Sequence, residues 1–248
     1  MQDAVAIVMA AGKGTRMKSE LPKVLFPLCD RPMIEYVLDA LEGAGIRRIL
    51  VVVGYRADLV RETLANRKHL EFVEQREQHG TGHAVMMCRE SLVGHQGPVL
   101  IVTGDSPMIQ SSSVKRLLAR FDRDRAACLL GTAHKENPHG LGRIVRDQAG
   151  SFLGIVEEKD ATPDERKITE VNMSTYVFAG PDLIYALDRL TNENAQKEYY
   201  ITDCPKILRA AGRSIAAVAE LEPQESLSVN SLDELAIVER VMRGEVSH

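Results

Sequence analysis

Short apolar runs alternate along the first half of the chain with segments whose apolar residues recur at helical spacing. The runs at 5–9, 49–53 and 99–103 are continuous, mostly β-branched and bounded by glycine or turn residues. Such runs are typical of strands that are buried on both faces of a parallel sheet. The alternation predicts an α/β fold with a doubly wound sheet. Its helices are expected at 33–41, 83–92 and 113–121.

The second half of the chain is less regular. Residues 142–161 have the pattern of two strands joined by a turn at Gly150, which predicts a hairpin. We find no internal repeat, low-complexity tract or clear linker, so one domain is expected over residues 1–248. The other elements expected here are strands at 174–180 and 214–221 and helices at 181–190 and 231–242.

A glycine-rich, positively charged loop, residues 10–16, follows the first predicted strand. Gly12 and Gly14 allow a sharp turn and bring backbone N–H groups close to a ligand. Arg16 adds a planar guanidinium that suits phosphate oxygens. Because ligands of open α/β sheets bind at the carboxyl ends of the strands, this loop is a candidate polyphosphate site. Met17 stands where both the Walker loop and the GxGxxG motif need glycine, and a merely flexible turn is the alternative.

The charge and composition of the 248-residue chain exclude several classes of protein. A formal net charge of −4 and the lack of tryptophan argue against a dedicated nucleic-acid-binding protein. The four cysteines lie far apart without a CxxC pair, which predicts reduced thiols rather than a zinc site or disulfides. The N-terminus lacks a signal-peptide pattern, and no apolar stretch approaches the roughly 20 residues of a membrane span. We therefore expect a cytoplasmic protein that does not enter a membrane.

Polar residues near the predicted strand ends are candidate ligands. Asp105 follows the run at 99–103, where it is either a turn residue or, beside a polyphosphate, a Mg²⁺ ligand. The Gln75 amide both donates and accepts, so it can pair with the imide edge of a pyrimidine. Thr81 is a plain helix N-cap in the alternative interpretation. Glycines lie between His79 and His83, which argues against a metal pair on one helix face.

Longer segments carry a resemblance to a known family. Residues 10–41 read AAGKGTRMKSELPKVLFPLCDRPMIEYVLDAL, and EQREQHGTGHAV, VTGDSPMI, NPHGLGRIVRD, GIVEEKDAT, EVNMSTYVF and NAQKEYYITD follow in order. In these segments the chain resembles the sugar-1-phosphate nucleotidylyltransferases. Within that superfamily it is most similar to the uridylyltransferase domain of the bifunctional enzyme that makes UDP-N-acetylglucosamine. The resemblance implies a Rossmann-like three-layer fold with a mixed, mainly parallel sheet. It places a nucleotide-binding half at about 1–110 and a sugar-binding half at about 111–248.

The resemblance also implies a reaction and its site residues. UTP and N-acetylglucosamine 1-phosphate would give UDP-N-acetylglucosamine and pyrophosphate, with Mg²⁺ as cofactor. The attacking phosphate is already anionic, so the site must position two anions and neutralise them rather than supply a general base. Arg16 and Lys23 would be the catalytic cations, and Asp105 and Asn230 the Mg²⁺ ligands. The nucleotide would bind at Ala10, Ala11, Gly12, Lys13, Gly14, Thr15, Gln75, Gly80 and Thr81. The sugar would bind at Gly140, Glu157, Asn172, Glu198 and Tyr199, with Thr202 beside them.

The chain departs from the family's pattern at a few positions. Thr103 stands where the family usually has Tyr, and Met173 and Ser174 follow Asn172 where it commonly has Thr or Ser and then Gly. These positions neighbour the expected sugar site, so they bear on the sugar preference more than on the nucleotidyl chemistry. The chain ends before the family's acetyltransferase domain, so neither acetyl transfer nor the trimerisation which that domain provides is expected. The sequence leaves open whether the chain forms a homo-oligomer.

Two other functions fit the same residues. The chemistry can be kept with another hexose 1-phosphate or another nucleoside triphosphate. Alternatively, the chain can be a non-catalytic sensor of nucleotide sugars. Such a sensor is expected to have lost the loop cation or the metal carboxylate, whereas Arg16, Lys23 and Asp105 are all present. The sequence therefore favours an enzyme.

Overall fold

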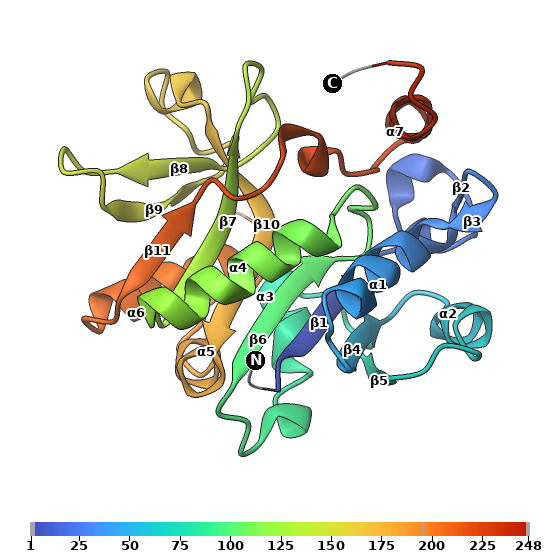
Figure 1. Ribbon diagram of the computed structural model, residues 1–248, viewed down its shortest axis with the longest axis horizontal. Coiled ribbons are helices and arrows are strands. Elements are labelled where there is room, and N and C mark those ends of the chain that lie inside the picture. Colours follow the sequence, from blue (N-terminus) through green and yellow to red (C-terminus); the bar gives the residue numbers. More distant parts are fainter. Residues whose placement is uncertain (1–2, 195, 247–248) are drawn as a thin grey trace.

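The computed structural model describes residues 3–194 and 196–246 and contains a central sheet with helices on both faces (Figure 1). The nine-stranded sheet has the order β11-β7-β10-β6-β1-β4-β5; in addition, β8 pairs with β10, and β9 pairs with β8. A short separate pair is formed by β2 (Pro27–Leu28) and β3 (Arg31–Pro32). The strands of the main sheet are β1 (Val5–Ala10), β4 (Arg48–Val53), β5 (Leu70–Glu74), β6 (Pro98–Thr103), β7 (Cys128–His134), β8 (Arg143–Arg146), β9 (Phe152–Val156), β10 (Glu170–Ala179) and β11 (Ile215–Val218).

Two hydrophobic cores lie on opposite faces of this sheet. Side chains alternate along a strand, so Ala6 and Val8 of β1 face one core while Val5 and Ile7 face the other. The helices are α1 (Met33–Gly43), α2 (Ala57–Thr63), α3 (Thr81–Met86), α4 (Ser111–Asp124), α5 (Gly180–Leu187), α6 (Cys204–Ala210) and α7 (Leu232–Met242). The first core packs against α1, α2 and α4, and the second against α3, α5 and α6. The three-layer α/β arrangement is therefore confirmed. Among the described residues we find no helix that could cross a membrane.

Strand direction places the candidate loops together. β1 runs parallel to β4 and β6, and β4 runs parallel to β5. β10 is antiparallel to both β6 and β7, which makes the sheet mixed but mainly parallel, as predicted. The carboxyl ends of β1, β5 and β6 meet at one edge of the sheet. The loop after Ala10, Gln75 and Asp105 therefore share that edge.

Most strongly patterned elements lie where the sequence predicts them. β1, β4 and β6 match the runs at 5–9, 49–53 and 99–103 to within one residue. The helix predicted at 83–92 is wrong in extent, because α3 ends at Met86 and a separate 3-10 turn covers Glu90–Leu92. The elements α2, β5, β7 and α6 were not predicted at all.

Candidate active site

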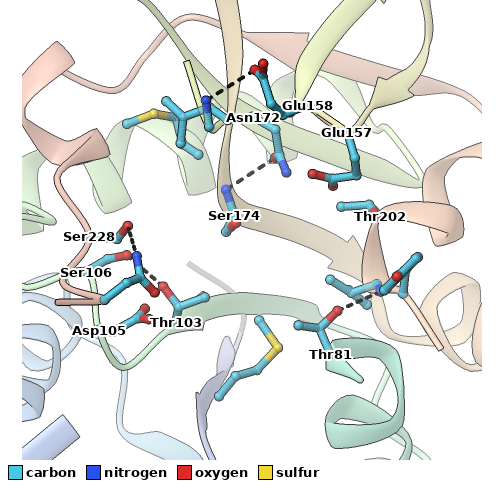
Figure 2. Close-up of a pocket in the computed structure, with 18 of the residues that line it drawn as sticks. Thr81, Thr103, Asp105, Ser106, Glu157, Glu158, Asn172, Ser174, Thr202 and Ser228 are labelled. Atoms are coloured by element: carbon cyan, nitrogen blue, oxygen red, sulfur yellow. Dashed lines mark hydrogen bonds between the residues drawn. The ribbon is translucent and has the colours of Figure 1, made fainter. Parts of the chain in front are cut away.

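A cavity of about 530 Å³ lies at the carboxyl ends of β1 and β6. Figure 2 shows Asp105, Ser106 and Ser228 on one side of it and Glu157 and Thr202 on the other. Its walls come from β6 and the turn after it, from β10, from the segment after β9, and from Asn194, Gln196 and residues 200–202. Side chains from both halves of the chain therefore meet in one space. The predicted site residues that line it are Arg16, Thr81, Asp105, Gly140, Glu157, Asn172, Thr202 and Asn230.

Lys23, Asp105 and Asn230 form one polar cluster at this cavity. Asp105 follows β6, Asn230 precedes α7, and Lys23 begins the 3-10 turn Lys23–Leu25. The Lys23 ammonium pairs with Asp105 Oδ2 and donates to Asn230 Oδ1 at 3.0 Å. The Lys23 and Asp105 side chains are only 16% and 17% exposed. A carboxylate oxygen and an amide oxygen thus converge on a single cationic position.

The oxygen atoms of Asp105 and Asn230 are suitable ligands for a magnesium ion. Asp105 and Asn230 offer hard oxygen ligands, the type that Mg²⁺ prefers. The described residues contain no group of three or more His, Cys, Asp or Glu side chains arranged around a common metal position. An ion at Asp105 and Asn230 would therefore take its remaining ligands from water and from phosphate oxygens, as Mg²⁺ usually does.

The glycine-rich loop lies directly against Lys23. Gly14 has a φ of 68°, a left-handed conformation that glycine adopts without strain. A Cβ on Gly14 would lie 2.7 Å from the Cβ of Lys23, so only glycine lets the lysine stem pack here. Arg16, two residues further on, is exposed and lines the cavity. The loop therefore places the Arg16 guanidinium in the cavity. Its glycine at position 14 also allows the Lys23 side chain to pack against it.

Lys13 lies at the flank of the loop rather than among the residues that line the cavity. Its Nζ is 4.8 Å from the centroid of the Tyr55 ring. The Tyr55 hydroxyl donates to Glu20 Oε2 at 2.6 Å, which ties the segment after the loop to the turn after β4. This hydrogen bond and the Lys13 charge lower the pKa of Glu20. Tyr55 thus contacts both the loop and the segment that follows it.

The segment at residues 80–82 packs against the backbone of residues 198–201. Gly80 has a φ of 103°, and a Cβ there would lie 2.5 Å from the Tyr199 carbonyl oxygen. Thr81 is the first residue of α3 and not its N-cap, and its Oγ1 accepts from the Ile201 N–H at 3.2 Å. The interpretation of Thr81 as an ordinary N-cap is therefore wrong. The close packing of these two segments therefore requires glycine at position 80 even without a ligand.

Glu198 and Tyr199, two of the predicted sugar-side residues, directly precede a segment that lines the cavity. Neither lies among the residues that line the cavity, whereas Tyr200 and Thr202 do. The Tyr199 N–H donates to the His79 carbonyl oxygen at 2.8 Å, and its own carbonyl oxygen accepts from the Gly82 N–H at 2.7 Å. These backbone bonds hold residue 199 toward α3. The residues that follow it then face the cavity.

A bulge in β10 forms one wall of the cavity. The pairing between β10 and β7 shifts between Asn172 and Thr175, and Ser174 adopts a φ of 49°. The Ser174 N–H donates to Asn172 Oδ1 at 3.2 Å, and Asn172 Nδ2 donates to the Tyr176 hydroxyl at 2.8 Å. Figure 2 shows Asn172 and Ser174 on this wall. The bulge thereby exposes Met173 and Ser174, two residues that depart from the family's pattern, to the cavity.

A buried arginine positions the loop that carries Gly140. Arg143 is 2% exposed and donates to Glu158 Oε2 at 2.6 Å and to the Leu141 carbonyl oxygen. The same carboxylate oxygen of Glu158 accepts from the Gly140 N–H at 3.2 Å. Sequence reasoning missed Arg143 and Glu158, although both lie within segments that carry the family resemblance. Their type alone does not distinguish them from surface charges.

Glu157, which lines the cavity, has a perturbed pKa. Burial raises its pKa, and the nearby carboxylates of Asp160 and Asp203 raise it further. Burial also raises the pKa of Asp203. This side of the cavity therefore offers hydrogen-bond acceptors in a partly desolvated place, which suits the hydroxyl groups of a sugar.

The mainly parallel sheet, the glycine-rich cationic loop and the oxygen ligands at its edge together define a nucleotidyltransferase. The chain belongs to the MobA-like NTP transferase domain family, whose model matches residues 6–200. It is 42% identical over 247 residues to the Bifunctional protein GlmU of Listeria monocytogenes serotype 4b (strain CLIP80459), which covers 100% of this chain and 54% of the relative. The chain thus spans about half the length of the curated relatives it matches.

Solved structures share the fold across almost the whole chain. A Bacillus anthracis protein assigned provisionally as a glucose-1-phosphate thymidylyltransferase, solved with sucrose, superposes with a TM-score of 0.81. That match covers 99% of this chain and 97% of the other at 18% identity. A UDP-glucose pyrophosphorylase complexed with UDP-glucose gives a TM-score of 0.75 at 17% identity, with 99% of this chain and 100% of the other covered. At these identities the likeness concerns the fold.

Proposed function

We propose that this nucleotidyltransferase transfers a uridylyl group from UTP to N-acetylglucosamine 1-phosphate and releases pyrophosphate. The observation that carries the proposal is the cluster of Lys23, Asp105 and Asn230, of which Asp105 and Asn230 line the cavity. The 42% identity to the Bifunctional protein GlmU and the family resemblance of the cavity residues support the choice of substrates.

The residues of the chain act by positioning charge. A phosphate oxygen of the sugar phosphate attacks the α-phosphorus of UTP, and pyrophosphate leaves from the opposite side. The attacking oxygen is already anionic at neutral pH, so no side chain has to remove a proton. Arg16 and Lys23 offset the repulsion between the two phosphate groups and stabilise the charge of the transition state.

Asp105 and Asn230 would hold Mg²⁺ in this proposal. When bound, the ion would neutralise phosphate charge and polarise the α-phosphorus. Lys23 belongs to the same cluster, so a phosphate group that binds there meets its ammonium group as well. On the other side of the cavity, Glu157 and Asn172 offer acceptors and donors for sugar hydroxyls.

A different hexose 1-phosphate is the second candidate acceptor. Thr103, Met173 and Ser174 all line the cavity, so the departures from the family's pattern lie where a sugar would bind. Two proteins with the same fold are named for glucose derivatives, a glucose-1-phosphate thymidylyltransferase and a UDP-glucose pyrophosphorylase.

A matrix of four nucleoside triphosphates against several sugar 1-phosphates, with and without Mg²⁺, tests the proposal. Pyrophosphate release is the readout. We expect the highest kcat/KM with UTP, N-acetylglucosamine 1-phosphate and Mg²⁺. A higher value with glucose 1-phosphate would favour the second candidate. Binding of UDP-sugars without any pyrophosphate release would refute catalysis and indicate a sensor.

A further inference from the structure

Two acceptors hold the side-chain amide of Gln75 in one orientation. Gln75 directly follows β5 and is only 3% exposed. Its Nε2 lies 3.1 Å from the Gly80 carbonyl oxygen and 3.0 Å from His83 Nδ1. Because a carbonyl oxygen can only accept, the amide nitrogen must face Gly80, and its second proton then points to His83. Among the described residues, Oε1 has no hydrogen-bond partner, so it is the polar atom of this side chain that a ligand can contact.

The contact defines the protonation of His83. Nδ1 accepts a hydrogen bond from Gln75, so the ring is neutral and carries its proton on Nε2. His83 lies in the first turn of α3, with the His79 ring centroid at 5.1 Å and that of Tyr199 at 6.3 Å. Burial and the neighbouring His79 lower the pKa of His83, while the backbone and carboxylate of Glu77 oppose them. The neutral ring therefore persists at neutral pH.

This part of the chain lies against the nucleotide loop. Gln78 Nε2 donates to the Ala11 carbonyl oxygen at 2.7 Å. At Gly54, a Cβ would lie 2.9 Å from Ala11 Cβ and 2.9 Å from the Gln75 carbonyl oxygen, so the backbones of the three segments are in close contact. The backbone at Gln75 therefore lies against the glycine-rich loop, to which the family resemblance assigns the nucleotide.

We propose that His83 is a positioning residue for base selection: by accepting from Gln75 Nε2, it presents Gln75 Oε1 to the base and favours uracil over cytosine. The inference rests on the proposed function. Uracil has an N3–H group, from which Oε1 can accept a hydrogen bond. Cytosine carries a lone pair at N3, which Oε1 repels. A site built around one acceptor discriminates against a base that lacks the matching donor.

The test compares the ratio of kcat/KM for UTP to that for CTP in three variants. His83→Leu removes the acceptor, and we expect the ratio to fall about fivefold to tenfold, the effect of one hydrogen bond. His83→Asn keeps an oxygen acceptor near the place of Nδ1, and we expect it to restore most of the ratio. His79→Asn is the matched control, because His79 is exposed and bonds to Glu77. Its ratio should stay within about twofold of wild type.

A wild-type ratio in folded His83→Leu would overturn the inference and leave the proposed function intact. A second measurement needs no nucleotide, namely the ¹⁵N chemical shifts of the His83 ring in the wild-type protein. We expect a protonated Nε2 and a bare Nδ1 at neutral pH, and a protonated Nδ1 would also overturn the inference. Loss of all activity with UTP in the wild type would instead refute the proposed function. The ring shifts would still decide how Gln75 is oriented.

Discussion

Replacing Lys23 by Met tests the polar cluster most directly. The change removes the charge but keeps a long apolar stem, which matters because the Lys23 side chain packs closely over Gly14. It leaves Asp105 Oδ2 and Asn230 Oδ1 without their shared donor. Two effects then compete, a loss of stability and a loss of transition-state stabilisation.

Their sizes differ enough to be separated. Unpairing partly buried oxygens costs about 1–3 kcal/mol of stability, against a total of about 5–15 kcal/mol for a typical domain. Lys23→Met should therefore stay folded, with Tm lowered by about 2–4 °C for each kcal/mol lost. Loss of one preorganised charge at the reacting phosphates lowers turnover by about 100- to 1,000-fold. Unfolding cannot account for a decrease of that size at room temperature.

The assay is pyrophosphate release at saturating UTP, N-acetylglucosamine 1-phosphate and Mg²⁺, paired with urea unfolding. The double variant Lys23→Met/Asp105→Asn separates the two effects, because a purely structural pair would recover when both charges are removed. We expect stability to recover in part and turnover to stay low. Lys18→Met is the control, because Lys18 is an exposed lysine between the glycine-rich loop and Lys23, and it should keep turnover within about twofold. A turnover of Lys23→Met within about fivefold of the wild-type value would refute the reasoning, and so would a double variant that regains turnover.

Three further predictions concern other parts of the cavity. Ser174→Gly should raise the free energy of unfolding, measured with urea, by about 1 kcal/mol. The strain of a side chain at a φ of 49° exceeds the cost of the added freedom of glycine in the unfolded chain. An unchanged free energy of unfolding would contradict this prediction. Burial raises the pKa of Glu157 in the folded state above its usual 4.5, so the folded state binds this proton more tightly than the unfolded state does. The stability of the wild type therefore falls as the pH rises from the pKa of the unfolded state through that of the folded state. Glu157→Gln should therefore lose less stability than wild type between about pH 4 and pH 8, and parallel urea midpoints would contradict the assignment. Gly80→Ala should cost about 2 kcal/mol or more, because its Cβ would meet the Tyr199 carbonyl oxygen, and an unchanged Tm would show that the segment can move aside.

Local pattern was sufficient for the centre of the sheet. β1, β4 and β6 are buried on both faces, so they appear as uninterrupted apolar runs that end at turn residues. Their parallel direction followed from the helices between them. The positions of the glycine-rich loop and of Asp105 at one edge followed in turn. Most residues of the nucleotide side were therefore predictable as neighbours.

Weakly patterned elements escaped the same reasoning. β5 is an edge strand whose glutamates are exposed, and its pattern suits a loop equally well. α6 has seven residues and opens on Cys204 and Pro205, which leaves too few turns for an apolar stripe to show. Such short elements owe their structure to packing against the rest of the protein more than to their own propensity.

The sequence by itself determined the fold class, the family and the types of side chain at the site. Only the tertiary structure decided how they meet. Lys23 contacts Asp105 and Asn230 across 82 and 207 positions of the chain, and no local pattern encodes such a contact. The same holds for the His83 acceptor that turns the Gln75 amide and for the bulge that brings Met173 to the cavity. Side-chain orientation depends on neighbours that only the packed sheet brings within reach of one another.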